Sequence, residues 1–290
     1  MITQFYKREE AGYPALLKEI TLAPLGIYIK GQWPPRERAA VAIVGTRRAT
    51  AAGRVLAGKL AAGLSRQKIT VVSGLALGID AAAHEGAIEA GGISWAVLAN
   101  GLDQIYPRQN YRLAEKIIDL GGALISEYPA GTPSLPHHFL ARNRIVSGLS
   151  RGTVIIEAPL NSGALVTARF TLEQNRELMV IPGPVNHPNY AGSHRLIKMG
   201  AALVTSVDDI LENLSLEKVA SRPLVASGVD GGLDELETKI VEAIKSAGAP
   251  VTIDTLGELS KLDPQTLNRA LTLLVINDII KESGGGKYSL

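Results

Sequence analysis

The stretch from Val41 to Gly45 reads VAIVG, and Thr46, Arg47 and Arg48 follow it directly. Small and β-branched apolar residues that end in glycine are typical of a strand buried on both faces and followed by a tight turn. The same pattern recurs in ITVVSG, WAVLANG, ALISE, TVIIEAP and LMVIPG, which begin at residues 69, 95, 123, 153 and 178, and in a shorter ALVT at residue 202. Segments with helical spacing separate these runs. We therefore expect an α/β fold with an extended Rossmann-like, doubly wound and mostly parallel sheet.

This strand rhythm divides the chain into four parts. Residues 1–36 form a short N-terminal lead-in, and residues 37–214 form the Rossmann-like domain. Residues 215–232 have no clear period and end in glycines, which predicts a linker. Residues 233–290 contain three segments with helical spacing and then a hairpin pattern around Gly284–Gly286. Three short helices and a hairpin predict a small C-terminal winged-helix domain.

The chain of 290 residues contains no cysteine, which excludes disulfides, thiolate metal sites and cysteine nucleophiles. The N-terminal MITQFYKREE has no apolar segment of the kind found in signal peptides. No apolar run approaches the length that crosses a bilayer. We expect a cytoplasmic protein with no membrane insertion.

Charge is distributed unevenly between the two expected domains. Residues 234–290 carry nine acidic and six basic residues, a net charge of −3, whereas the whole chain carries +2. The rest of the chain therefore holds +5. A polyanion site belongs in this larger, basic part.

Open parallel sheets bind ligands outside the carboxyl ends of their strands. The residues expected there are rich in glycine, serine, threonine and arginine, which let backbone N–H groups and helix N-termini approach a phosphate. A dinucleotide site predicts G-x-G-x-x-G after a strand, but GTRRATAAG at residues 45–53 lacks that spacing. The P-loop pattern is absent as well. Tight turns need glycine in any case, so plain turn chemistry stays an alternative, but several such turns on one edge favour an anion site of another kind.

The segment HFLARNR at residues 138–144 places two arginines around an asparagine, ahead of an apolar helical stretch. One interpretation is a solvated helix face, or an arginine paired with Glu127 or Glu157. The other is a set of guanidinium groups that converge on one sheet edge and bind several phosphates in a row. The members of that set are Arg47, Arg48, Arg108, Arg142 and Arg144.

Patterns for catalysis are weak. None of the five histidines has H-E-x-x-H spacing or clusters with carboxylates as a metal site does. His84 follows Asp80 by one helical turn, which favours an i,i+4 hydrogen bond or another buried polar contact. Glu157 ends a strand and suits either a catalytic acid or an ion pair with a neighbouring arginine, and we favour the ion pair. We expect no catalysis, no metal and no cofactor.

Several motifs in order resemble the DprA/Smf family of DNA-processing proteins. They are VAIVGTR from residue 41, SGLALGID from residue 73, GLDQIYP from residue 101, RNRIVSGLS from residue 142 and SGALVTA from residue 162. The resemblance extends from about residue 13 to residue 214. It implies a non-catalytic homodimer that binds single-stranded DNA without sequence specificity and loads RecA in natural transformation and recombination.

The resemblance also assigns DNA-binding residues, and these largely coincide with the residues of the sheet edge. They are Gly45, Thr46, Arg47, Arg48, Ser73, Gly74, Arg108, Arg142, Asn143, Arg144, Ser162, Gly163 and Thr167.

Three features depart from the family pattern. Leu77 stands where SGLARGID of the family has arginine, which removes one positive charge. We also expect no SAM-like domain of the kind that precedes the Rossmann core in many members. The expected third helix of the C-terminal domain offers only Arg269 as a basic residue, so we favour protein contact or a structural role for that domain over duplex DNA binding.

Two other functions fit the fold class. A nucleotide-processing enzyme of the LOG-like Rossmann group carries P-G-G-x-G-T-x-x-E, but the comparable residues 161–168 read NSGALVTA, with no glutamate before Glu173. A winged-helix regulator with a ligand-sensing domain predicts tight, sequence-specific binding of duplex DNA.

Overall fold

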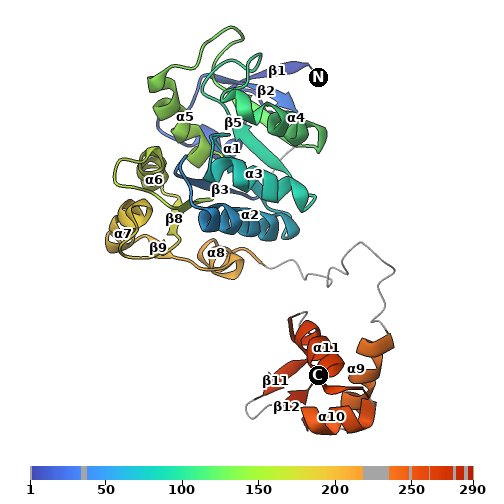
Figure 1. The fold of residues 1–290 in the computed structure, drawn as a ribbon. Helices are drawn as coiled ribbons and strands as arrows, with labels where there is room; N and C mark the ends of the chain where they lie inside the picture. The colour runs from blue at the N-terminus through green and yellow to red at the C-terminus, as the bar shows by residue number, and fades with distance from the viewer. Residues whose placement is uncertain are drawn as a thin grey trace. The chain divides into compact units, whose positions relative to one another are not determined.

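The computed structural model describes residues 2–33, 38–217, 235–247, 250–260, 262–276, 279–283 and 287–289. The chain separates into two compact units, residues 1–221 and 222–290 (Figure 1). Most of the expected linker lies outside the described residues. Within the described part, no helix is long and apolar enough to cross a membrane.

The first unit is built on a nine-stranded sheet. Its strand order is β1-β2-β6-β5-β4-β3-β7-β8-β9. Every pairing from β3 to β9 is parallel, and β1 and β2 join antiparallel at one edge. The strands are β1 (Thr3–Lys7), β2 (Gly26–Gly31), β3 (Ala40–Gly45), β4 (Thr70–Ser73), β5 (Ser94–Val97), β6 (Ala123–Ser126), β7 (Gly152–Ile156), β8 (Glu177–Val180) and β9 (Ala202–Leu203). The predicted Rossmann-like, doubly wound α/β fold is confirmed.

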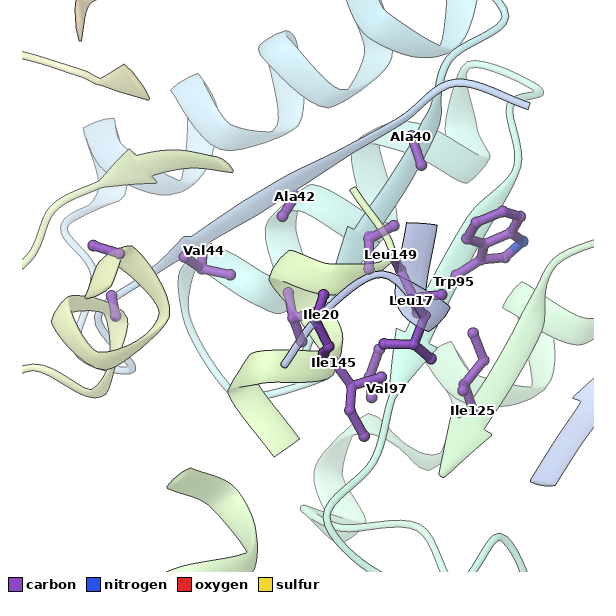
Figure 2. Close-up of a cluster of buried hydrophobic side chains, with 14 of the residues drawn as sticks. Leu17, Ile20, Ala40, Ala42, Val44, Trp95, Val97, Ile125, Ile145 and Leu149 are labelled. Atoms are coloured by element: carbon purple, nitrogen blue, oxygen red, sulfur yellow. The ribbon is translucent and has the colours of Figure 1, made fainter. Parts of the chain in front are cut away.

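Strand β3 shows why the sheet is covered on both sides. Ala40, Ala42 and Val44 contribute to one hydrophobic cluster, whereas Val41 and Ile43 contribute to another. Side chains alternate between the faces of a strand, so an unbroken apolar run buries both of them. Figure 2 shows the first of these faces packed against the helical segments that carry Leu17, Ile145 and Leu149.

Helices are distributed between the two faces of the sheet. The cluster around Ala42 includes residues of α1, α5, α6 and α7, whereas clusters on the other face include residues of α2, α3, α4 and α8 (Figure 1). These helices are α1 (Ala15–Lys18), α2 (Ala51–Arg66), α3 (Ile79–Glu89), α4 (Tyr111–Asp119), α5 (Pro136–Gly148), α6 (Gly163–Glu173), α7 (Ala191–Lys198) and α8 (Val207–Asn213), with single 3₁₀ turns η1 (Arg108–Asn110) and η2 (Pro188–Tyr190).

The topology fixes where a ligand can enter. The chain proceeds outward from β3 through β4, β5 and β6 on one side and then returns to β7 on the other. This reversal of strand order between β3 and β7 opens a crevice outside their carboxyl ends, which is the usual ligand position in such sheets.

The lead-in is part of the first unit. Strands β1 and β2 extend the sheet beyond β6, and Leu17 of α1 is fully buried in the core. Two further anchors fasten it. Nη2 of Arg176 donates to Oε2 of Glu19 over 2.7 Å, and Nε of Arg144 donates to the Leu22 carbonyl over 2.9 Å.

The second unit has the helices that the sequence predicts. They are α9 (Glu235–Ala247), α10 (Ile253–Ser260) and α11 (Pro264–Ile276). Strands β10 (Val251–Thr252), β11 (Lys281–Ser283) and β12 (Lys287–Ser289) form a small antiparallel sheet in the order β10-β12-β11. The hairpin tip at Gly284–Gly286 and the side chain of Arg269 lie outside the described part. The assignment as a winged helix stays a prediction.

Candidate functional site

The turn after β3 is fixed by its backbone and presents two arginines. The Thr46 amide donates to the Glu157 carbonyl over 2.8 Å, and the Thr46 carbonyl accepts from the Ile79 amide over 3.3 Å. The Arg48 amide donates to Thr46 Oγ1 over 3.2 Å. Because these hydrogen bonds hold the backbone of the turn, the exposed side chains of Arg47 and Arg48 extend from fixed backbone positions.

A cavity of about 660 Å³ opens at this edge of the sheet, where the turns after β3 and β4 meet α5 and the start of α6. It contains most of the residues that the sequence singles out. Those lining it are Gly45, Thr46, Arg47, Arg48, Gly74, Arg142, Asn143, Ser162, Gly163 and Thr167.

Three of the expected site residues do not line this cavity. Ser73 is fully buried and donates to the Ile43 carbonyl over 2.6 Å. Arg144 forms a bidentate pair with Glu127, with nitrogen–oxygen distances of 2.9 and 2.7 Å. Arg108 is exposed in η1. For Arg144, the alternative of an ion pair with Glu127 is confirmed. Of the five arginines expected to converge, only Arg47, Arg48 and Arg142 line the cavity.

Arg142 is in the floor of the cavity and is only 4% exposed. Its Nη1 donates to the Gly74 carbonyl over 2.6 Å and to the Val97 carbonyl. Gly74 lacks a side chain at a point where a Cβ atom would collide with the guanidinium group. Burial, and to a lesser degree the charge of Arg47, lowers the pKa of Arg142 to about 10, against the opposing effect of Asp80. The arginine is thus still charged at neutral pH, but its contacts are mainly internal.

Asp80 also lines the cavity and is the counter-charge of Arg142. It is buried at the start of α3 and accepts from the amides of Gly74 and Ala76 over 3.1 and 3.4 Å. Burial raises the pKa of Asp80, while Arg142 opposes the rise. Asp80 and Arg142 both hold Gly74, one through its amide and the other through its carbonyl, so they fix the turn after β4.

The start of α6 supplies another side of the cavity. Ser162 caps this helix by accepting from the Ala164 amide over 3.2 Å. Asn143 of α5 donates to the Gly163 carbonyl over 3.2 Å and ties the two helices together. An eleven-residue helix places partial positive charge at its N-terminus. Anions are therefore favoured at this end of the cavity.

An aromatic wall completes the cavity, and the sequence analysis did not identify it. Phe139 and Tyr106 line the cavity with ring centroids 5.4 Å apart, and the Arg47 guanidinium lies 5.2 Å from the centre of the Phe139 ring. The available signal was an aromatic residue within the arginine-bearing segment of a chain that has only three phenylalanines. The wall combines a π surface with an exposed cation, the pair of groups that bind a base and its phosphate.

Glu157 lies beside this cavity and has no free acceptor position. Oε1 accepts from the hydroxyls of Thr50 and Tyr190, and Oε2 accepts from the Thr50 amide and the Asn189 side chain. Burial acts to raise the pKa of Glu157, but these hydrogen bonds outweigh it and hold the pKa below its ordinary value. The expected ion pair with an arginine is wrong, because hydroxyl and amide donors occupy the carboxylate instead. Glu157 is also poorly suited to act as a catalytic acid, because its lowered pKa keeps the carboxyl group deprotonated.

His84 and Ser150 serve as structural groups. His84 Nδ1 lies 2.6 Å from Ser94 Oγ, so of the two expected contacts the structure has the buried polar contact and not a hydrogen bond to Asp80. Ser150 lies in GLSRG, which matches the nucleophile-elbow pattern, but it comes before β7 and donates to the Val146 carbonyl over 3.0 Å. An elbow serine follows a strand instead. Among the described residues, no three metal-binding side chains gather.

The first unit is similar in sequence to known proteins of one family. Residues 4–215 match the family model of DNA recombination-mediator protein A. Protein Smf of Escherichia coli is 45% identical over 202 residues, which cover 70% of this chain and 54% of that protein. The DNA processing protein DprA of Streptococcus pneumoniae is 41% identical over 199 residues, 69% of this chain and 70% of the relative.

Two solved structures share the fold. The X-ray structure of DprA from Streptococcus pneumoniae is 39% identical, with a TM-score of 0.68 over 72% of this chain and 73% of that one. A structure of DprA from Helicobacter pylori, described by its single-stranded DNA binding mode, is 29% identical, with a TM-score of 0.64 over 73% of this chain and 96% of that one. The present chain spans about half the length of the Escherichia coli relative. It belongs to the family of DNA recombination-mediator protein A, whose members include the DprA and Smf proteins.

Proposed function

We propose that the first unit binds single-stranded DNA without sequence specificity at the cavity between β3 and α5. The observation that supports this most directly is the grouping of Arg47 with the Phe139 and Tyr106 rings. Single-strand binders combine cationic groups along the backbone with aromatic surfaces on which unpaired bases stack. In a duplex the bases are already stacked on one another, so they are not available to stack on an aromatic surface of the protein.

The proposed contacts divide by chemistry. Arg47, Arg48 and the N-terminus of α6 bind phosphates, and Phe139 and Tyr106 bind bases. Gly45 and Gly74 make room inside the protein, Gly45 for Ile79 and Gly74 for the Arg142 guanidinium. Arg142 acts from the floor through its charge and its hold on Gly74. Arg108, exposed in η1 beyond Tyr106, extends the track for the backbone. Ser73 and Arg144 act as internal supports in this proposal.

We also propose the wider role that the family description supports. The chain acts without catalysis, as a homodimer in the cytoplasm, and mediates the loading of RecA onto DNA during uptake and recombination. The full hydrogen-bond occupancy of Glu157 supports the non-catalytic part, because it leaves the carboxylate no position for a substrate.

A single substitution tests the site. Arg47→Ala removes one phosphate contact and one cation over Phe139, so it should weaken binding of oligo(dT) and of mixed sequences alike. The slope of log affinity against log salt should fall in magnitude by about 0.7, the value for one phosphate on a single strand. Fluorescence anisotropy over a salt series measures both effects.

Arg151 provides the matched control. It is also exposed but precedes β7, at the amino end of the strands and so at the opposite edge of the sheet. Arg151→Ala should bind as the parent does. Equal affinities for the parent and Arg47→Ala, with Arg151→Ala the weaker, would place DNA at the other edge and refute the proposed site.

A further inference from the structure

A partly buried polar network lies directly behind the arginine turn and outside the cavity. It joins Glu157 at the end of β7, Thr50 at the start of α2, and Asn189 and Tyr190 in η2. We propose that Glu157 and Asn189 are positioning residues that hold the Thr46–Thr50 segment in the conformation in which Arg47 and Arg48 meet DNA phosphates. This inference rests on the proposed function of the cavity.

Glu157 holds both ends of the segment. Its carbonyl accepts from the Thr46 amide over 2.8 Å, and its carboxylate accepts from the Thr50 amide over 2.9 Å. Its φ of +51° lies in the left-handed region, which a non-glycine residue adopts only at an energetic penalty. Gly53 provides the space, since a Cβ atom there would collide with the carboxylate. In this strained conformation, the carbonyl and the carboxylate of Glu157 each accept a hydrogen bond from one end of the Thr46–Thr50 segment.

Asn189 holds the middle of the segment. Its Nδ2 donates to the Arg48 carbonyl over 3.0 Å and to Oε2 of Glu157 over 2.9 Å. It therefore connects the backbone of an arginine to the fixed carboxylate. His187 secures Asn189 in turn, because its Nδ1 accepts from the Asn189 amide over 3.2 Å. The loop after β8 is in this way coupled to the turn after β3.

The network strengthens DNA binding by limiting the backbone conformations that Arg47 and Arg48 sample in the free protein. Without the Asn189 side chain, the Arg48 carbonyl loses its bond to Asn189, and one bond to Glu157 is lost. The Arg47–Arg48 backbone then samples more conformations in the free protein. DNA has to order it at the time of binding, which weakens the affinity without removing any atom that touches DNA.

The test uses the full chain and oligo(dT). Asn189→Ala changes no charge and should weaken binding about threefold to tenfold, as expected when one or two more side chains must be ordered. Its circular dichroism spectrum should match that of the parent. The matched control is Asn186→Ala, which truncates an exposed asparagine of the same loop and should leave affinity unchanged. If Asn189→Ala is insoluble, Asn189→Ser replaces it with the same expectation.

A double-mutant cycle separates positioning from a direct or merely structural role. In an Arg47→Ala, Arg48→Ala background, measured at low salt where residual binding is strong enough, Asn189→Ala should cause no further loss. An equal loss in both backgrounds would overturn the inference, as would parental affinity of Asn189→Ala when Arg47→Ala binds weakly. Absence of oligo(dT) binding by the parent would instead refute the proposed function itself.

Discussion

Arg142 and Arg144 lie two positions apart on α5, and their side chains leave the helix in nearly opposite directions. Residues at i and i+2 are about 200° apart around a helix axis. The structure accordingly directs Arg142 into the cavity floor and Arg144 to Glu127 on the other side. Helical geometry alone therefore excludes a common role for the two, although the residue types suggest one.

Arg142 and Arg144 should differ in their effect on stability. Arg142→Ala leaves two buried carbonyls and Asp80 without their cation, so it should lower the free energy of unfolding by about 3 kcal/mol. Arg144→Ala breaks a bidentate pair whose side chains are only 13% and 16% exposed, so it should lower the free energy of unfolding by about 2 kcal/mol. Urea unfolding measures both. An Arg142→Ala variant as stable as the parent, yet unable to bind oligo(dT), would make Arg142 a direct DNA contact instead.

His84 should make stability depend on pH. Burial, and then the charge of Arg142, lowers its pKa to about 3 in the folded protein, whereas the pKa in the unfolded chain is about 6.5. The unfolded state therefore binds the proton first. The stabilisation is complete above pH 6.5 and decreases toward pH 3, by up to about 1.4 kcal/mol per pH unit.

His84→Gln provides the comparison for this effect. It removes the titration, so its free energy of unfolding should fall less steeply than that of the parent between pH 6.5 and pH 4.5. Urea titrations at several pH values give both curves. Parallel curves would mean that His84 can be protonated in the folded state.

At the scale of elements, α2 and α3 pack closely because glycines meet between them. A Cβ atom on Gly86 would collide with the backbone of Gly58, whereas a Cβ atom on Gly58 would have Ala82 O as its nearest neighbour at 3.6 Å. Gly86→Ala should therefore destabilise the first unit by about 2 kcal/mol. Gly58→Ala should be neutral or stabilising by up to about 1 kcal/mol, since alanine favours a helix interior.

Thermal unfolding of the two alanine variants checks this packing. Gly86→Ala should lower the unfolding midpoint, whereas Gly58→Ala should leave it unchanged or raise it. Equal shifts of the unfolding midpoint would contradict the observed crossing of the two helices.

How far elements can be predicted depends on their burial. Strands β3 to β8 are continuous apolar runs because both faces are covered, and the sequence analysis located all of them. It missed β1, whose side chains are mostly exposed, and the two-residue β10. It also missed β2, which is largely buried but lies in the segment that the sequence analysis assigned to a lead-in, so burial alone does not decide which strands are found. The aromatic wall could not be found from local patterns, because Tyr106 and Phe139 lie far apart in sequence and meet only through the tertiary fold. The same holds for Glu157, whose partners come from α2 and η2.

At the scale of the whole molecule, the basic charge and the cavity belong to the same unit. Residues 234–290 are net negative, and the cavity is formed entirely by residues of the first unit. Lys281 and Lys287 are exposed in the second unit, whose role as a winged helix for protein contact stays a prediction. Binding of single strands should therefore be a property of the first unit.

The most direct measurement compares oligo(dT) with a duplex of equal length across a salt series, using the full chain. The central claim predicts tighter binding of the single strand at every salt concentration, because only unpaired bases can stack on Phe139 and Tyr106. Affinity for both should fall steeply as salt rises. Tighter binding of the duplex, or an affinity for oligo(dT) independent of salt, would contradict the account.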